Sequence, residues 1–132
     1  MHARTALAAL AVTALIAPLG TIAPAHASHG GRDDVRNSGS CSEGAHWKLK
    51  AKHDSGRIEV EGEVDSNRSG QVWHWMLKHN GSVSARGKGT TGGRSGSFSV
   101  ERRMADLAGK DHIMFRAERA ATGEVCRGRV SL

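Results

Sequence analysis

The chain has 132 residues and a formal net charge of +6, with two Cys, three Trp, two Phe and no Tyr. This length allows one domain, and no stretch after residue 27 is long and apolar enough to span a bilayer, which excludes an integral protein with helical spans. A domain of this size buries only about 60–65% of its unfolded surface, so a covalent cross-link is expected to matter.

The first 27 residues have the pattern of a secretory signal peptide. A short polar start leads into an apolar run over residues 6–19, and the segment ends in Ala25-His26-Ala27. Small residues at these positions suit signal peptidase, so we expect cleavage after Ala27, with cleavage after Ala25 as the alternative. We therefore expect a secreted, extracellular protein. Its expected parts are a signal peptide (1–27), a flexible leader almost without apolar residues (28–40) and a β-sandwich domain (41–132).

Two cysteines, Cys41 and Cys126, bracket the part of the chain that is expected to fold. Two cysteines in an oxidising compartment most often pair, so we expect a disulfide. It would close a loop of 84 residues, for which the chain-entropy model gives roughly 4–5 kcal/mol as an upper estimate. Neither cysteine lies in a CxxC motif or has a histidine at ligand spacing, which disfavours a reactive or metal-binding thiol.

From residue 45 onward the apolar residues recur with a period of two, which predicts β-strands. Residues 45–52 and 58–64 form the first such pair. Folding them about a four-residue loop sets Lys50 opposite Glu59 and Lys48 opposite Glu61. Such pairs of opposite charge contribute roughly 0.2–1 kcal/mol each. The row of lysines is therefore better explained as half of a neutralised ladder than as a stripe that binds nucleic acid.

The next predicted strand, residues 71–78, points Trp73 and Trp75 inward. A three-residue loop with a left-handed Gly81 would pair Leu77 with Val83, and it matches the apolar phase better than a two-residue Asn-Gly loop. Residues 87–96, which are rich in glycine, are predicted to form a flexible loop.

Three more strands are predicted over residues 97–103, 111–119 and 124–132, with a crossing connection at 104–109. The last two would pair Ala117 with Cys126. The registers also set two aromatic rings over glycines, Trp47 over Gly62 and Phe115 over Gly128. Short strands with regular turns predict an all-β fold, a single antiparallel β-sandwich of about seven strands with one disulfide.

Three stretches carry a resemblance to a known family: WKLKAKHDSGRIEVEGEVDSNRSGQVW from Trp47, GSFSVERR from Gly96, and AGKDHI with TGEVCRGRVSL near the end. The run from Cys41 onward resembles small secreted actinobacterial proteins with an immunoglobulin-like or fibronectin-III-like β-sandwich, a group without an established function. The resemblance implies the fold and the location, and it carries over no catalytic residue. The cysteines depart from the immunoglobulin pattern, since this bridge would tie the chain ends together.

In an immunoglobulin-like order, the strands near 72–78, 111–119 and 124–132 share one sheet. Its outward side would set Arg116 directly opposite Arg127, and like charges across strands are destabilising. We find no structural reason for the excess of cations on this side of the sheet. The candidate binding residues on it are Arg116, Arg127, Arg129, His74, Met76, His112 and Met114.

These observations predict a secreted, non-enzymatic binding or interaction module whose basic side faces an anionic cell-envelope polymer or an acidic protein. One alternative is an extracellular protein that binds copper or another metal through the His and Met residues. A second is a secreted protease inhibitor, although a flexible loop at 87–96 disfavours it. A solvated basic side that aids solubility is the simplest alternative. We expect no catalytic residues, cofactor, nucleic-acid partner or membrane span, and a monomer.

Overall fold

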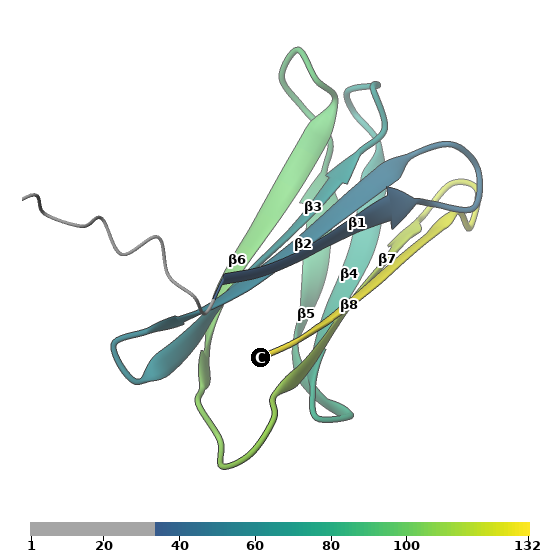
Figure 1. Cartoon of the computed structure of the whole chain (residues 1–132). Helices are drawn as coiled ribbons and strands as arrows, with labels where there is room; N and C mark the ends of the chain where they lie inside the picture. Colours follow the sequence, from purple (N-terminus) through teal and green to yellow (C-terminus); the bar gives the residue numbers. More distant parts are fainter. Residues whose placement is uncertain (1–33) are drawn as a thin grey trace, which may run out of the picture.

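The computed structural model describes residues 34–132, so the expected signal peptide and residues 28–33 of the expected leader lie outside the described residues. The described part consists of strands and connections (Figure 1), and it contains no helix long and apolar enough to cross a bilayer. The strands are β1 (Asp34–Ser40), β2 (His46–Asp54), β3 (Arg57–Asp65), β4 (Val72–His79), β5 (Ser82–Thr90), β6 (Ser97–Ala105), β7 (His112–Arg119) and β8 (Val125–Ser131).

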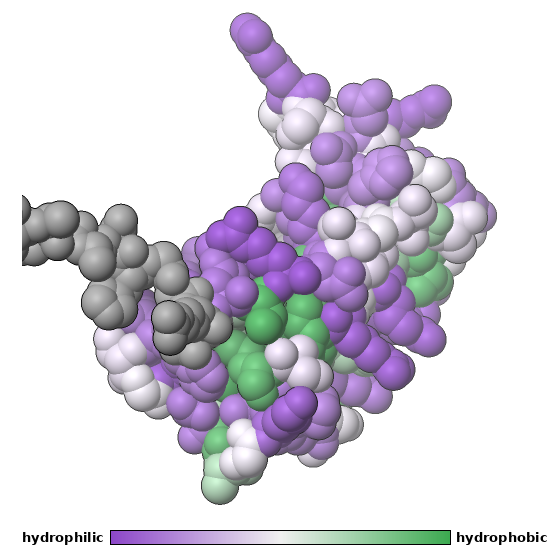
Figure 2. All heavy atoms as spheres, in the orientation of Figure 1, coloured by the Kyte–Doolittle hydropathy of each residue, from purple (hydrophilic) through white to green (hydrophobic). Residues whose placement is uncertain are grey.

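The eight strands form two four-stranded antiparallel sheets, and the predicted β-sandwich is confirmed. Sheet A has the order β1-β2-β3-β6 and sheet B the order β5-β4-β7-β8 (Figure 1). Strands β2 to β8 supply the seven strands of the immunoglobulin-like pattern, with β5 beside β4, and β1 is an eighth strand outside it. In the orientation of Figure 1, apolar atoms gather near the C-terminus (Figure 2). Val35 and Leu132 are partly buried and pack against the core.

The predicted flexible leader over residues 28–40 is wrong for residues 34–40, because these form strand β1. Asp34–Ser40 pairs along its whole length with β2, with Val35 opposite Ala51 and Asn37 opposite Leu49. An edge strand can be held by its ladder of backbone hydrogen bonds, even though only Val35 adds a large apolar side chain. In addition, the Asn37 side-chain amide donates to the carbonyl of Arg129 on β8, at 3.1 Å. The prediction of a flexible leader relied on the near absence of apolar residues, and composition does not reveal pairing through the backbone.

The β2–β3 hairpin has the predicted faces but a different register. Its turn has two residues, Ser55 and Gly56, both with positive φ (53° and 76°), as tight hairpin turns require. Lys50 therefore faces Glu61, and Lys48 faces Glu63. A slip of two residues keeps every side chain on its own face, so alternation alone could not detect it.

The β4–β5 hairpin also differs from the prediction. It uses the two-residue Asn80-Gly81 loop, and a register shift between Leu77 and Lys78 then sets Trp75 opposite Gly87. Residues 87–90 belong to β5 instead of a loop. The reason is packing: a Cβ on Gly87 would lie 2.8 Å from the Trp75 ring, and one on Gly89 would overlap the ring of Phe98.

The core repeats this packing of rings on glycines. The register that sets Phe115 opposite Gly128 and Ala117 opposite Cys126 is confirmed. The ring that covers Gly128 is nevertheless that of Trp47, from sheet A, whereas Phe115 covers Gly62. The prediction that Trp47 lies over Gly62 is thus wrong.

The predicted disulfide between Cys41 and Cys126 is present. It joins the connection after β1 to the last strand, so it links the two sheets at one end of the sandwich. Strand β6 continues to Ala105 with Met104 buried, where a crossing connection was expected from residue 104.

Candidate functional site

The outward side of sheet B carries a set of cations that we call the basic face: Lys78, Arg86, Lys88, Arg116, Arg127 and Arg129. They come from all four strands of the sheet, because alternate residues of a strand point to the same side. One row crosses the sheet, in which Met76 has Arg86 and Arg116 as its neighbours and Arg116 has Arg127. Glu118 is the one carboxylate among the outward residues of these four strands. The prediction that β4, β7 and β8 share one sheet is confirmed.

One arginine of the basic face, Arg116, forms an ion pair in addition to lying opposite Arg127. Its Nη2 donates to Glu118 Oε2 at 2.6 Å, and the Arg116 side chain is 30% exposed. Within residues 34–132, Arg127 and Arg129 form no ion pair, although both are exposed. The excess of positive charge therefore lies mainly on β8 and on the β5 edge.

The outward side of sheet A is balanced by comparison. Lys48 and Lys52 form ion pairs with Glu63 and Glu59, each at 3.1 Å, and the hydrogen bonds to these carboxylates raise the pKa of both lysines. The hydrogen bond from Arg36 lowers the pKa of Asp34, against the opposing effect of burial.

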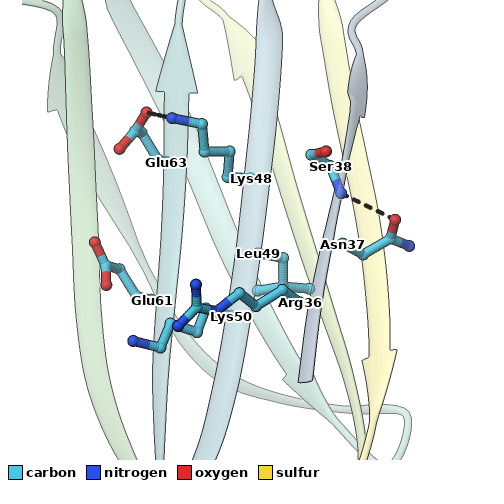
Figure 3. Close-up of a pocket in the computed structure, with 8 residues that line it drawn as sticks. All are labelled: Arg36, Asn37, Ser38, Lys48, Leu49, Lys50, Glu61 and Glu63. Atoms are coloured by element: carbon cyan, nitrogen blue, oxygen red, sulfur yellow. Dashed lines mark hydrogen bonds and ion pairs between the residues drawn. The ribbon is translucent and has the colours of Figure 1, made fainter. Parts of the chain in front are cut away.

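A hollow on sheet A lies along β1, β2 and β3 (Figure 3). Its cations have carboxylate partners: Lys48 contacts Glu63, and Arg36 and Lys50 both contact Asp34, at 2.7 and 3.8 Å. Since this charge is internally neutralised, the hollow offers an anion much less than the basic face does.

The His and Met residues that lie among the cations of the basic face do not gather in one place. His74 lies opposite Glu118, and His112 is six residues further along β7, which separates the two histidines by about 20 Å. His74 and Met76 line one hollow, beside Arg86 and Arg116.

His112 and Met114 line a second hollow with Lys78 and Arg129. There, His112 Nδ1 lies 2.7 Å from Ser131 Oγ. Among residues 34–132 no three His, Cys, Asp or Glu side chains gather as a metal site. The four residues proposed as one metal site are thus divided between two hollows, each bordered by cations.

The candidate binding residues predicted from the sequence leave out Lys78, and sequence reasoning did not place two further members of the basic face on this sheet, Arg86 and Lys88. They lie on β5, in a stretch where Ala85, Gly87 and Gly89 alternate with charged residues. Small residues at every second position were interpreted as a sign of flexibility. The alternation itself was the available signal, because small inward residues leave room for the rings of the opposite layer.

Comparisons of the chain with protein-family models, with curated proteins and with solved structures find no match. The chemistry of the site is therefore argued from its own residues. The strongest feature is a concentration of guanidinium groups on one side of sheet B, and guanidinium binds carboxylates and phosphates through two parallel hydrogen bonds.

Proposed function

We propose that this protein is a non-enzymatic binding module whose basic face takes an extended anionic polymer. The observation that carries the proposal is the opposition of Arg116 and Arg127 on neighbouring strands. Opposed like charges cost stability, and an anion bound between them would offset that cost. The balanced ladder on sheet A supports the proposal, because it shows that the excess of positive charge is confined to sheet B and is not a property of the whole surface.

The shape of the basic face favours a polymer over a small anion. Its cations extend across four strands, a width of about 14 Å at the usual strand spacing. They surround no enclosed cavity, so a small anion would reach only one or two of them. A chain with repeated negative charges reaches several at once, and repeated weak contacts add up to useful affinity.

The expected secretion of the protein narrows the polymer to one outside the cell, and we propose an anionic polymer of the cell envelope. Phosphodiester and carboxylate groups both match guanidinium donors. An acidic protein surface is the competing partner, and it would present its carboxylates in a fixed pattern instead of a repeat. The two differ in whether short, flexible oligomers of the polymer compete for binding.

Retention on immobilised polymer tests the proposal. The intact protein is passed over a phosphodiester polymer of the teichoic type and over an acidic polysaccharide, with a neutral polysaccharide as the blank. The test variant carries Arg127→Glu and Arg129→Glu. The control variant carries Arg94→Glu and Lys110→Glu, which reverse two exposed cations in connections outside the basic face and give the same net charge.

We expect the control variant to be retained like the unmodified protein and the test variant to elute with the blank. Retention should fall as salt is added, since exposed charges are screened over about 8–10 Å at moderate ionic strength. Equal retention of the two variants would mean that net charge alone drives binding, and the proposal would then be wrong. No retention of the unmodified protein on either polymer would favour an acidic protein partner or a merely solvated face.

A further inference from the structure

The basic face has a hollow at one end, where the β4–β5 turn, the start of β7 and the end of β8 meet. We call it the corner hollow. Its volume is about 380 Å³, within the range of about 300–1,000 Å³ that small-molecule sites occupy. Its polar side chains are those of Lys78, His112, Arg129 and Ser131, with Met114 among them. None of the described residues that line it is acidic.

The strand pairing sets one cation on each side of the corner hollow. Lys78 on β4 lies opposite Met114 on β7, and Met114 lies opposite Arg129 on β8. The backbones that carry the two cations are therefore about 10 Å apart, at the usual strand spacing. Arg129 is exposed and Lys78 is half-buried, so both side chains can reach a group placed over Met114. Within residues 34–132 neither cation forms an ion pair.

A histidine and a serine in hydrogen-bond contact form one end of the corner hollow. His112 lies opposite Ser131, and its Nδ1 is 2.7 Å from Ser131 Oγ. If the hydroxyl donates to Nδ1, the neutral ring carries its proton on Nε2 and can donate from there. If Nδ1–H donates to the serine, the hydroxyl hydrogen is left for a ligand. Since both residues are exposed, the pair offers a donor to a molecule in the hollow in either arrangement.

Two hydrogen bonds hold this corner of the sandwich in place. The backbone N–H of His112 donates to Asn80 Oδ1 at 2.8 Å, and the backbone N–H of Asn80 donates to the carbonyl of His112 at 2.9 Å. They tie the β4–β5 turn to the start of β7. The wall that carries His112 is therefore fixed before any ligand binds.

The acidic side chains on β7 and just before it do not neutralise the corner hollow. Asp111, the residue before the strand, is 1% exposed and contacts His79. Glu118 lies four residues after Met114 on the same strand, about 13 Å away. The hollow thus combines two cations and a further donor without a carboxylate in its lining, which suits an anion.

The placement of the donors favours a phosphate over a carboxylate. They lie on two sides of the hollow and at one end of it, and all of them rise from the sheet beneath the ligand. An sp² oxygen accepts best near the plane of its own group, so a carboxylate meets only some of these donors well. The oxygens of a phosphate point to the corners of a tetrahedron and can accept from several directions at once. Lysine, arginine and serine are all common donors to phosphate.

We propose that the corner hollow binds a phosphate group of the envelope polymer, which makes this polymer a phosphodiester and not a polysaccharide with carboxylates. Lys78 and Arg129 donate to the phosphate from its two sides, and the histidine–serine pair donates from the end. The row of Arg116 and Arg127 lies two residues away along β7 and β8, at about 7 Å, where a further charge of the same chain can bind. This inference rests on the proposed function, since it names the polymer that the basic face takes.

Two oligomers of equal length and charge test the choice of phosphate. A glycerol phosphate oligomer and an oligogalacturonate are each titrated into the intact ¹⁵N-labelled protein, with inorganic phosphate as a third probe. The backbone signals of Gly81, Met114 and Arg129 are followed by NMR. We expect saturable shifts with both oligomers. The phosphate oligomer should bind at least about tenfold more tightly, the effect of about one charged hydrogen bond.

A double variant removes the histidine–serine pair and leaves every arginine in place. In His112→Ala with Ser131→Ala, we expect most of the preference for phosphate to be lost, while both oligomers still bind through the arginines. The control carries His46→Ala and Ser99→Ala, the same two changes at exposed positions on sheet A, and should keep the preference. Ser131→Ala alone serves the same test if thermal unfolding shows the double variant to be unfolded.

The outcomes separate this inference from the proposed function. Equal affinity for the two oligomers in the unmodified protein would overturn the inference and leave the proposed function standing, whereas binding of neither oligomer would overturn both. A preference that persists unchanged in the double variant would place the phosphate elsewhere on the protein. Inorganic phosphate binding more tightly than the phosphate oligomer would make the corner hollow a site for free phosphate, which also contradicts the inference.

Discussion

Arg116 and Arg127 lie directly opposite each other on β7 and β8, with both side chains on the outward side of sheet B. Arg116 bonds to Glu118 on its own strand, and Arg127 has no carboxylate partner among residues 34–132. The balanced ladder of β2 and β3 shows that this fold can pair its surface charges. The opposed arginines are therefore a local stress in sheet B.

Relief of that stress should stabilise the free protein. Arg127→Glu sets a carboxylate opposite Arg116, and we expect it to raise the free energy of unfolding by about 0.2–1 kcal/mol at low ionic strength. Urea unfolding at low and high salt measures the change, which should shrink as salt screens the pair. Arg127→Gln, which only removes the repulsion, should gain less. A lower stability for Arg127→Glu than for the unmodified protein would show that the opposed arginines are not a stress.

The glycines under aromatic rings should be intolerant of even a methyl group. A Cβ on Gly128 would overlap the Trp47 ring, whereas one on Gly92 would have no atom within 4 Å. We expect Gly128→Ala to cost about 1–3 kcal/mol, the usual effect of overpacking, and Gly92→Ala to change stability by less than about 0.5 kcal/mol. Chemical unfolding of the two variants tests this. Equal effects in both would contradict the packing described for Trp47.

The alternation of apolar residues was enough to predict which side of each strand faces the core, but it could not set the registers. Lys50 faces Glu61 instead of Glu59 because a slip of two residues leaves both faces unchanged. The turns decided the register, and their positive φ values at Ser55 and Asn80 are unusual for residues other than glycine.

The polar end of the core was missed for a different reason. Arg119 is the last residue of β7, and Gln71 and Glu124 directly precede β4 and β8. All three continue the inward phase of Trp73, Ala117 and Cys126. Polar residues at the end of a strand are ordinarily assigned to loops. Three of them in the inward phase, at the same end of neighbouring strands, were the signal for a polar end of the core.

The acid limit of stability should depend on Asp34. Its pKa in the folded protein lies below the usual 3.8, chiefly through the hydrogen bond from Arg36 and also through the charges of Lys50 and Lys52. A lowered folded pKa means that the carboxylate stabilises the protein above its unfolded pKa, and that this contribution is lost as the pH falls through the folded value. We expect Asp34→Asn to be less stable than the unmodified protein near neutral pH.

The same two proteins should become equally stable as the pH falls well below 3.8. Unfolding by denaturant between pH 7 and pH 2 measures the difference. A gap between them that stays constant with pH would show that Asp34 acts through packing instead of charge. Asp106→Asn is a useful comparison, because within residues 34–132 Asp106 forms an ion pair with His53 alone and lies outside the network around Arg36.

Loss of the disulfide should affect stability and leave the basic face intact. Replacing both Cys41 and Cys126 by Ser frees a loop of 84 residues, and we expect a loss of up to about 4–5 kcal/mol. Retention on anionic polymer should persist at temperatures where circular dichroism shows that the variant is folded. A folded variant that no longer binds would show that the bridge shapes the basic face directly.

The most direct test of the central proposal is to map where an anionic polymer touches the protein. A short phosphodiester oligomer is titrated into ¹⁵N-labelled protein, and backbone and side-chain shifts are followed by NMR. We predict that the perturbed signals belong to the outward residues of β5, β4, β7 and β8, centred on Arg116 and Arg127. Shifts centred on the Lys/Glu ladder of sheet A, or no saturable shift at low salt, would contradict the account.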